Sequence, residues 1–347
     1  MKKFNEMNLN LFKKILNNSK RPAILAGSGI KISGTEKKLY RFVKKNKIPI
    51  VTAWCHDIFP NFDNLYYGRQ GTIGNRVGNF IIQNADLVVV LGSRLSIRQI
   101  SYNWKNFAKK AKIISVDIDK FVLDNNLVKI DYKFNIDLKS FFKKIEKINF
   151  LISEKISNKR KQWIKWCNYI RKNFSPKYSD YKEYNKINVY HFIFYLFSRL
   201  KKKHMIVAAD GAATVVPNQV GYLNNDVKYI ANSGSASMGF ELPAAIGASI
   251  ADKKKIICLA GDGSIMMNLQ ELQSIKSLNL NIIIFLINNN GYLSIKQTQK
   301  NFFKREFGSS PESKLDFPNF NLVAESFGLK SILLKKKKLE KTTRFDH

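Results

Sequence analysis

The sequence predicts an α/β protein with two doubly wound parallel-sheet domains. Short runs rich in apolar and β-branched residues alternate with helix-like segments along the 347 residues, which is the pattern of parallel sheets covered by helices on both faces. Several of these runs are apolar at every position, as strands buried on both faces are. Hydrophobic residues make up 45% of the chain and aromatic residues 12%, which is enough apolar material for two cores.

The first series of strand-like runs predicts a domain over residues 1–145. Glycine turns close two of these runs, at Gly27 and Gly29 and again at Gly92. Glycine lets a ligand approach the backbone closely, and ligands of such sheets bind at the carboxyl ends of the strands. The predicted strands of this domain are residues 22–29, 48–52, 86–93 and 112–119.

Residues 146–186 are rich in Lys, Trp and Tyr and contain no strand-like run, so they predict a helical connector with an irregular stretch near Ser175 and Pro176. A second series of runs follows and predicts a second α/β domain over residues 187–347. The two halves share this pattern but no sequence motif. The predicted strands of the second domain are residues 205–210, 228–232, 255–260, 281–287 and 330–334.

The composition argues against several classes of protein. No apolar run reaches the roughly 18 residues of a membrane span, and the first twenty residues carry no secretory signal, so we expect a cytoplasmic protein without a membrane partner. Cys55, Cys167 and Cys258 lie far apart without metal-site spacing, so we expect reduced thiols. The net charge of +33 raises the alternative of nucleic-acid binding. Because the lysines are spread along the chain without a nucleic-acid motif, we favour solvated lysine-rich faces.

The most specific signal stands at the ends of two predicted strands. Residues 261–264 read Gly-Asp-Gly-Ser and residues 288–292 read Asn-Asn-Asn-Gly-Tyr. Parallel strands joined by a helix bring their carboxyl ends to the same edge of the sheet, so the carboxylate of Asp262 should meet an amide there. Mg²⁺ prefers such oxygen ligands and commonly bridges them to phosphates. The glycines would let phosphate oxygens approach the backbone, and Ser264 could donate from the first turn of the following helix.

This arrangement, with Asn289 standing 27 positions after Asp262, resembles the signature of thiamine-diphosphate-dependent enzymes. The resemblance implies that Asp262, the side chain of Asn289 and the carbonyl of Gly291 bind Mg²⁺. It also implies that the backbone N–H of Tyr292 binds the diphosphate. The other predicted contacts of the cofactor in these two stretches are Gly261, Gly263 and Ser264. The alternative is a coincidence of two polar strand ends, which the spacing disfavours.

A second stretch, residues 232–248, resembles the same family and in particular enzymes of the acetolactate synthase type. It reads Asn-Ser-Gly-Ser-Ala-Ser-Met-Gly-Phe-Glu-Leu-Pro-Ala-Ala-Ile-Gly-Ala. In the family, a bulky apolar residue at the position of Met238 wedges between the two rings of the cofactor and forces them into a V; the alternative is a methionine that fills a gap in the core. Gly234 is a further predicted cofactor contact. Glu241 stands where the family often has Gly, which we interpret as a subgroup feature.

Residues 210–214, Asp-Gly-Ala-Ala-Thr, stand where this domain usually makes its first diphosphate contacts. The Gln/His pair common in acetolactate synthases is replaced by Ala212 and Ala213. Only backbone donors, such as that of Gly211, and the hydroxyl of Thr214 therefore remain. A capped helix start explains the stretch almost as well.

The first domain resembles the family's central domain, which in some members carries FAD. Residues 71–74, 92–94 and 116–119 fall where such members hold the flavin nucleotide, and Arg94 could pair with a phosphate. Many relatives keep this domain as a scaffold without flavin. We therefore expect thiamine diphosphate and Mg²⁺ as cofactors and favour a scaffold over FAD.

The resemblance leaves out the residue that drives the family's chemistry. A buried glutamate protonates the aminopyrimidine of the cofactor, and it lies in an N-terminal pyrimidine-binding domain that acts across a dimer interface. Here the central-domain resemblance begins around residues 13–29, so no catalytic residue is predicted in this chain. The final strand and helix that usually close the second sheet are also missing after Leu334. Both ends lead us to expect a fragment, or a subunit completed by a homo-oligomer or a separately encoded pyrimidine-binding chain.

The leading hypothesis is a thiamine-diphosphate- and Mg²⁺-binding, acetolactate-synthase-like enzyme subunit or fragment. The resemblance implies that its relatives decarboxylate a small 2-oxo acid and transfer the enamine to an acceptor, as transferases or lyases. The alternatives are a 2-oxo-acid decarboxylase completed by a separate chain, a non-catalytic remnant or scaffold, and a nucleic-acid-binding protein. The resemblance implies that the residues that select the donor and acceptor substrates lie partly in the pyrimidine-binding domain.

Overall fold

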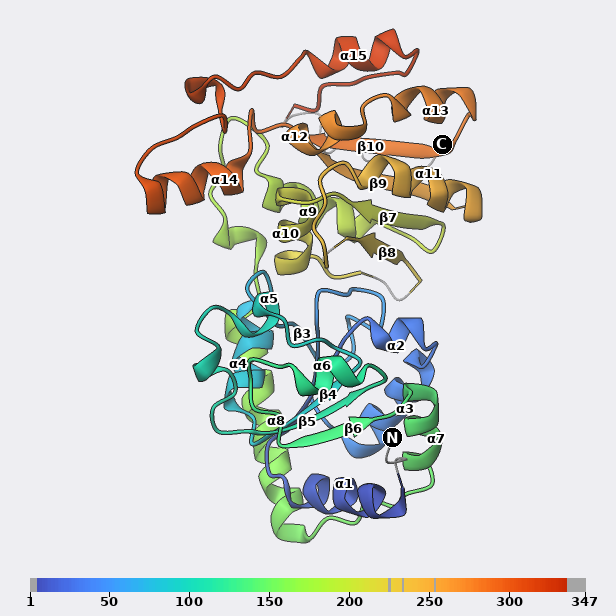
Figure 1. The fold of residues 1–347 in the computed structure, drawn as a ribbon, viewed down its shortest axis with the longest axis vertical. Helices are drawn as coiled ribbons and strands as arrows, with labels where there is room; N and C mark the ends of the chain where they lie inside the picture. The colour runs from blue at the N-terminus through green and yellow to red at the C-terminus, as the bar shows by residue number, and fades with distance from the viewer. Residues whose placement is uncertain (1–4, 224–225, 233, 253, 336–347) are drawn as a thin grey trace. The chain divides into compact units, whose positions relative to one another are not determined.

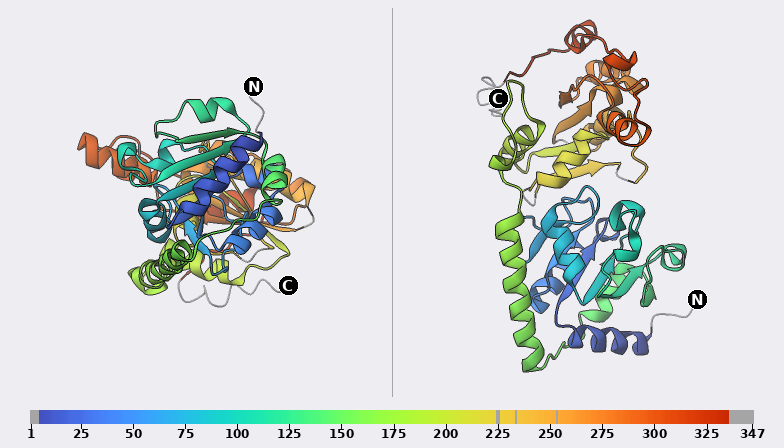
Figure 2. Two further views of the ribbon diagram at one scale, coloured as in Figure 1. Left: turned by 90° about the horizontal axis from the view of Figure 1, so that it is seen from below. Right: turned by 90° about the vertical axis from the view of Figure 1, so that its left-hand side faces the viewer.

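The computed structural model describes residues 5–223, 226–232, 234–252 and 254–335. The chain forms two compact units, residues 1–176 and 177–347. Each unit contains one parallel sheet with helices on both faces (Figures 1 and 2). The predicted fold class, an α/β protein with two doubly wound parallel sheets, is confirmed.

Six parallel strands form the sheet of the first unit, in the order β3-β2-β1-β4-β5-β6. Four of them coincide with predicted runs: β1 (Pro22–Ala26), β2 (Ile50–Thr52), β4 (Leu87–Leu91) and β5 (Lys112–Asp117). Every residue of β1 and β4 is buried, as a strand covered on both faces requires. The two edge strands, β3 (Tyr66–Arg69) and β6 (Tyr132–Asn135), were not predicted.

Helices cover the first sheet on both faces. Val77 and Ile81 of α4 (Arg76–Asn84) pack with Trp163 of α8 (Glu154–Phe174) in one core. Phe12 of α1 (Glu6–Asn18) packs edge-on against Phe141 of α7 (Leu138–Ile145) in a separate aromatic cluster. The helices of this unit are α1 (Glu6–Asn18), α2 (Gly29–Ile32), α3 (Glu36–Asn46), α4 (Arg76–Asn84), α5 (Ile97–Ile100), α6 (Lys120–Asp124), α7 (Leu138–Ile145) and α8 (Glu154–Phe174).

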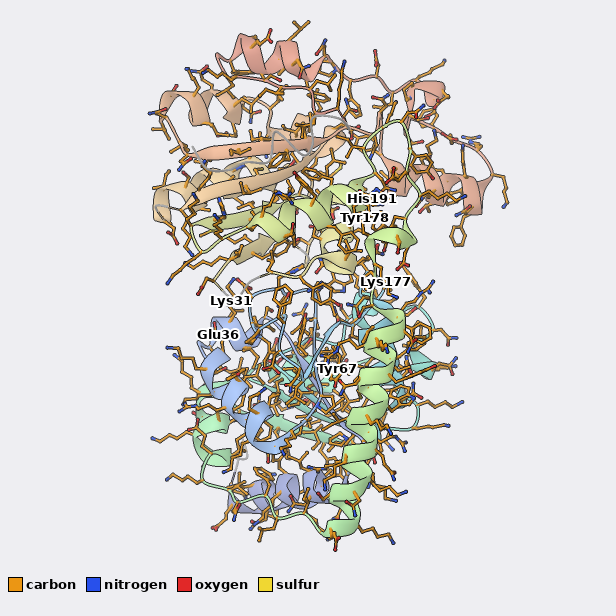
Figure 3. The ribbon with its side chains drawn as sticks, turned by 180° about the vertical axis from the view of Figure 1, so that it is seen from behind. Lys31, Glu36, Tyr67, Lys177, Tyr178 and His191 are labelled. Carbon is orange, nitrogen blue, oxygen red and sulfur yellow. The ribbon has the colours of Figure 1, made fainter. Side chains whose placement is uncertain are left out.

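The long helix α8 comes from the segment predicted as a connector, and it is anchored to the first unit. The indole N–H of Trp163 donates to the carbonyl oxygen of Pro22 at 2.9 Å. Tyr67 lies beside α8 (Figure 3), and its hydroxyl donates to Oδ1 of Asn168 at 2.8 Å. The guanidinium of Arg171 also lies 4.9 Å from the centre of the Tyr67 ring. The helix therefore belongs to the packing of the first sheet.

Four parallel strands form the sheet of the second unit, in the order β10-β9-β7-β8. They are β7 (His204–Ala208), β8 (Lys228–Ala231), β9 (Lys255–Gly261) and β10 (Ile282–Ile287), close to the predicted runs. Alternate side chains of β9 enter different cores. Ile257 packs toward α9 (Val189–Arg199) and α10 (Ala212–Val220), whereas Cys258 packs toward α11 (Glu241–Ala251) and α13 (Glu271–Ser277). The sheet is thus covered on both faces.

The predicted strand at residues 330–334 is wrong. These residues follow α15 (Phe320–Ser326) and pair with no strand among the described residues, and the side chains of Ile332 and Leu333 are 67% and 62% exposed. An apolar run becomes a strand only when it finds a backbone partner. The helices of this unit are α9 (Val189–Arg199), α10 (Ala212–Val220), α11 (Glu241–Ala251), α12 (Asp262–Ile265), α13 (Glu271–Ser277), α14 (Leu293–Thr298) and α15 (Phe320–Ser326).

None of the helices described is long and apolar enough to cross a membrane. The three cysteines form no disulfide. Burial raises the pKa of Cys55 to about 12, with the nearby Asp57 carboxylate contributing, and burial also raises the pKa of Cys258. These thiols therefore stay protonated and are structural rather than reactive.

Candidate functional site

Asp262 is the centre of the candidate site and connects the ends of two strands. Parallel pairing sets Gly261 at the end of β9 opposite Ile287 at the end of β10. Asp262 follows directly and is 2% exposed. Its Oδ1 accepts from the N–H of Gly263 at 2.8 Å, and its Oδ2 accepts from the N–H groups of Asn289 and Gly291 at 3.0 Å each. The structure thus brings the two predicted half-motifs into one hydrogen-bonded unit.

The turn after β10 is fixed by close packing. Gly291 has a φ of +151°, and a Cβ there would lie 2.3 Å from the carbonyl oxygen of Ser309. A Cβ on Gly263 would lie 2.1 Å from the ring of Tyr292, so the ring covers this glycine. The backbone N–H of Tyr292 donates to the Ser309 carbonyl oxygen at 3.0 Å, and its predicted donation to a diphosphate stays a prediction.

Three observations bear on whether the residues at this edge could hold a cation. None of the ion pairs among the described residues involves Asp262, although its carboxylate is buried. The side chain of Asn289 is exposed and accessible to a ligand. The described residues contain no group of three or more His, Cys, Asp or Glu side chains that could hold a metal. The Mg²⁺ ligand set predicted from the sequence contains only one such side chain, that of Asp262. Its other ligands are the side-chain amide of Asn289 and the backbone carbonyl of Gly291.

Ser264 uses both functions of its hydroxyl within the chain. Its Oγ donates to Oε2 of Glu241 at 2.8 Å and accepts from the N–H of Gly239 at 2.9 Å. Glu241 is fully buried, and this burial raises the pKa of its carboxyl; the charge of Asp210 raises it further. The structural importance of Glu241 was missed from the sequence. The sequence signal that could have identified this role is Glu241 itself, an acid at a position where the family often has Gly.

Met238 and Gly234 lie in the connection between β8 and α11. Met238 is 41% exposed, so it does not fill a gap in the core. The next residue, Gly239, has a φ of +80° and forms the tight turn before α11. A Cβ added at Gly234 would meet nothing within 4 Å, so open space surrounds this glycine.

Gly211 begins the connection from β7 into α10. It has a φ of +61°, and a Cβ there would meet nothing within 4 Å. The hydroxyl of Thr214 donates to the carbonyl oxygen of Ala209 and is buried, so it serves the start of the helix. Among the donors predicted in residues 210–214, the backbone near Gly211 is the one that borders open space.

The segments compared with flavin sites lie at the carboxyl edge of the first sheet. The N–H of Gly71 donates to Oδ1 of Asn79 at 2.9 Å, and Arg94 is exposed. Burial raises the pKa of Asp117, and Asp119 caps the first turn of α6. These contacts serve the local backbone, and the expectation of a scaffold without FAD stays a prediction.

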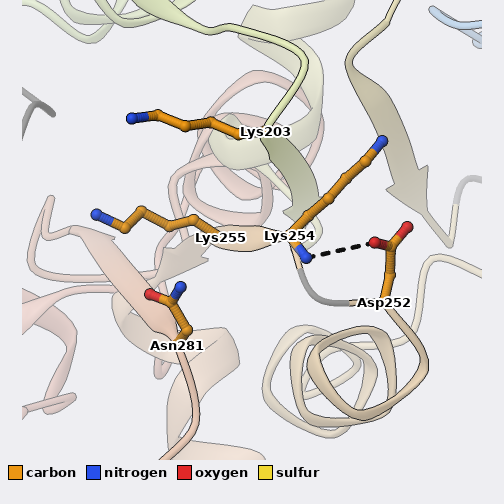
Figure 4. Close-up of a pocket in the computed structure, with 5 residues that line it drawn as sticks. All are labelled: Lys203, Asp252, Lys254, Lys255 and Asn281. Carbon is orange, nitrogen blue, oxygen red and sulfur yellow. Dashed lines mark hydrogen bonds between the residues drawn. The ribbon is translucent and has the colours of Figure 1, made fainter.

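A pocket of about 330 Å³ lies elsewhere in the second unit (Figure 4). Lys203 precedes β7, Lys255 begins β9 and Asn281 precedes β10, so the pocket stands at the amino ends of the strands. Asp262 stands at their carboxyl ends. This pocket is therefore outside the candidate site.

Comparison with known families gives two matches. Residues 9–145 match the central domain of thiamine pyrophosphate enzymes. Residues 211–344 match the C-terminal TPP binding domain of thiamine pyrophosphate enzymes, and this range contains every predicted site residue. The first range contains all six strands of the first sheet, and the second range contains β8, β9 and β10 of the second sheet, with β7 just before it.

Curated relatives are similar to the chain across both ranges. The probable acetolactate synthase large subunit of Methanococcus aeolicus is 30% identical over 344 residues, covering 92% of this chain and 54% of the relative. The acetolactate synthase large subunit of Lactococcus lactis is 31% identical, with 91% and 53% covered. The chain thus spans about half the length of the curated relatives it matches. By both of its matched domains, this chain belongs to the thiamine pyrophosphate enzyme family and is similar to acetolactate synthase large subunits.

Proposed function

We propose that this chain is a thiamine-diphosphate- and Mg²⁺-binding subunit or fragment of an acetolactate-synthase-like enzyme in the cytoplasm. The observation that carries the proposal is the Asp262 carboxylate, which joins the turn after β9 to the turn after β10 by accepting from the backbone N–H groups of Asn289 and Gly291. A buried acid at the meeting point of two strand ends, beside an exposed Asn289 side chain, is a ligand set for a hard cation.

In this proposal, Asp262, the side chain of Asn289 and the carbonyl of Gly291 bind Mg²⁺. Met238 holds the two rings of the cofactor in their V. Open space beside two of the proposed contact glycines supports a ligand there, since a Cβ at either would touch nothing within 4 Å. The proposed contacts of the diphosphate and its surroundings are Gly211, Gly234, Gly261, Gly263, Ser264 and Tyr292.

Thiamine diphosphate supplies a carbanion-stabilising thiazolium when it is bound. The residues of this chain hold the metal and the diphosphate, and we propose that the glutamate that acts on the aminopyrimidine comes from another domain, in a homo-oligomer or a separate chain. The relatives named above are large subunits of acetolactate synthase. We therefore propose a small 2-oxo acid as the substrate. For the first unit we propose a scaffold role without FAD, since the described contacts at the carboxyl edge of its sheet serve the local backbone.

A calorimetric titration of the full chain with thiamine diphosphate tests the proposal. We expect binding in the presence of Mg²⁺ and its loss with EDTA. Asp262→Asn should weaken binding at least about 10-fold, because it removes a charge from the metal site. Asp252→Asn is the matched control, since Asp252 pairs with Lys228 at the opposite edge of the sheet. If the wild-type chain shows no Mg²⁺-dependent binding even with a complementing pyrimidine-binding domain, the proposal is wrong.

Product analysis distinguishes the two proposed reactions. With pyruvate and a complementing domain, an acetolactate-synthase-like enzyme forms a product with a new carbon–carbon bond. A simple 2-oxo-acid decarboxylase releases CO₂ and an aldehyde only. Release of no CO₂ from any 2-oxo acid would support a non-catalytic scaffold instead.

A further inference from the structure

A buried chain of hydrogen bonds connects two turns of the candidate site. It runs from Glu241 through Ser264 to Gly239, and we call it the Glu241 chain. The hydroxyl of Ser264 donates to Oε2 of Glu241 at 2.8 Å, and the N–H of Gly239 donates to that hydroxyl at 2.9 Å. Nδ2 of Asn268 donates to the carbonyl oxygen of Gly239 at 2.8 Å. Gly239 is therefore held at both polar backbone atoms by the segment that follows Asp262.

The packing gives this turn little room for another arrangement. Gly239 has a φ of +80°, and a Cβ there would lie 2.6 Å from Cβ of Met267. The hydroxyl of Ser264 can rotate unless an acceptor fixes it, and Glu241 supplies that acceptor. Ser264 is 6% exposed and Glu241 is fully buried, so bulk water cannot readily replace the acid.

Burying Glu241 opposes folding. Its second oxygen, Oε1, is buried and has no hydrogen-bond partner among the described residues. An unsatisfied buried polar atom costs about 1–3 kcal/mol. Proteins keep such unfavourable groups mainly at functional sites. The acid also lies three residues after Met238 and two after Gly239, which connects this cost to the candidate site.

We propose that Glu241 is a positioning residue: through Ser264 it fixes the turn at Met238 and Gly239 relative to the loop at Asp262. This inference rests on the proposed function, which assigns Met238 to the shape of the cofactor and Asp262 to the metal. The Glu241 chain then sets the distance between the turn at Met238 and the loop at Asp262, which contact opposite ends of the bound cofactor and its metal.

Hydrogen exchange of the Gly239 amide in the cofactor-free chain tests the connection itself. Glu241→Ala should accelerate this exchange about 10-fold, because Ser264 loses the acceptor that holds it in place. Glu241→Gln should leave the exchange nearly unchanged, because its amide oxygen can accept from Ser264. Ile275→Val, a buried change in the same core, controls for a general loss of stability. Unchanged Gly239 exchange in Glu241→Ala would overturn the proposal, whether or not a cofactor binds.

Calorimetric titration with thiamine diphosphate and Mg²⁺ tests the role in binding. Glu241→Ala and Ser264→Ala should each weaken binding about 10-fold, and the double variant should be no worse than either, because both break one chain. Glu241→Gln should restore binding to within about 2-fold of wild type. Additive losses, or wild-type affinity in Glu241→Ala, would overturn the positioning role. Absence of binding by the wild-type chain would overturn the proposed function, and Gly239 exchange alone would then decide whether Glu241 positions the turn.

Discussion

Folding removes the carboxyl of Glu241 completely from water, so the free energy of unfolding has a pH dependence that can be measured. Burial raises the pKa of its carboxyl above the ordinary value of 4.5. The folded state therefore binds this proton more tightly than the unfolded state does. The stability that comes from the protonated acid is fully present below about pH 4.5, and it decreases as the pH rises through the pKa of the folded state.

We expect Glu241→Gln to flatten this dependence, because glutamine does not ionise. The free energy of unfolding of Glu241→Gln should increase relative to that of the wild type as the pH rises above about 4.5. The limiting slope of this difference is about 1.4 kcal/mol per pH unit for one proton. Urea unfolding at a series of pH values measures it. Glu325→Gln, on the exposed surface of α15, is the control and should leave the slope nearly unchanged. A wild-type and a Glu241→Gln curve that run parallel would contradict this prediction.

Gly291 tests how tightly the turn after β10 is packed. Gly291→Ala would place a methyl group 2.3 Å from a backbone oxygen, at a φ that L-residues rarely adopt. We expect a loss of about 1–3 kcal/mol in the free energy of unfolding. Gly234→Ala is the matched change in open space and should cost less than about 0.5 kcal/mol. Equal losses in the two variants, measured by urea unfolding, would show that the turn can relax.

At the scale of single residues, the sequence predicts contacts that follow from strand order but not contacts between turns. Asp262 and Asn289 follow neighbouring parallel strands, so their meeting could be expected from the pattern. The contact between Glu241 and Ser264 depends on the packing of α11 against α12, which no periodicity in the sequence encodes. The sequence therefore identifies the Asp262 loop but gives Glu241 no partner.

At the scale of elements, α11 contains a position where stability can be gained. Gly247 lies inside this helix, is exposed, and a Cβ there would meet nothing within 4 Å. We expect Gly247→Ala to raise the free energy of unfolding by about 0.5–1 kcal/mol, because alanine loses less backbone entropy on folding. Thermal or urea unfolding measures the gain. A loss of stability instead would mean that another surface covers this face of α11 in solution.

Strands were predictable where burial on both faces made them apolar at every position, as in β4. The edge strand β3 contains Gly68 and Arg69, and β6 contains Lys133 and Asn135, so neither shows that pattern. The run at 330–334 ends in three apolar residues, yet it pairs with no strand among the described residues. Strand pairing is a property of the partner as well as of the segment, and sequence patterns describe only the segment.

At the scale of the whole molecule, the proposed site uses residues of the second unit alone. A ligand stabilises the folded state to which it binds, by about 2.7 kcal/mol when it is present at 100 times its Kd. We expect thiamine diphosphate with Mg²⁺ to slow hydrogen exchange in β9 and β10 but not in α8. Exchange measured by mass spectrometry, with Asp262→Asn as the control, tests this expectation. Equal slowing in α8 would contradict a site confined to the second unit.

The strand β10 stands at the end of its sheet and has a consequence for behaviour at high concentration. Its six residues, Ile282–Ile287, are all apolar and half-buried, and among the described strands it pairs with β9 alone. An apolar edge strand without charge or proline is a template on which strands of other molecules can assemble. The net charge of +33 opposes such encounters by mutual repulsion, and about 0.1 M salt screens that repulsion beyond about 10 Å. The excess of lysine therefore opposes aggregation at low salt, and added salt should lower the protein concentration at which the chain aggregates.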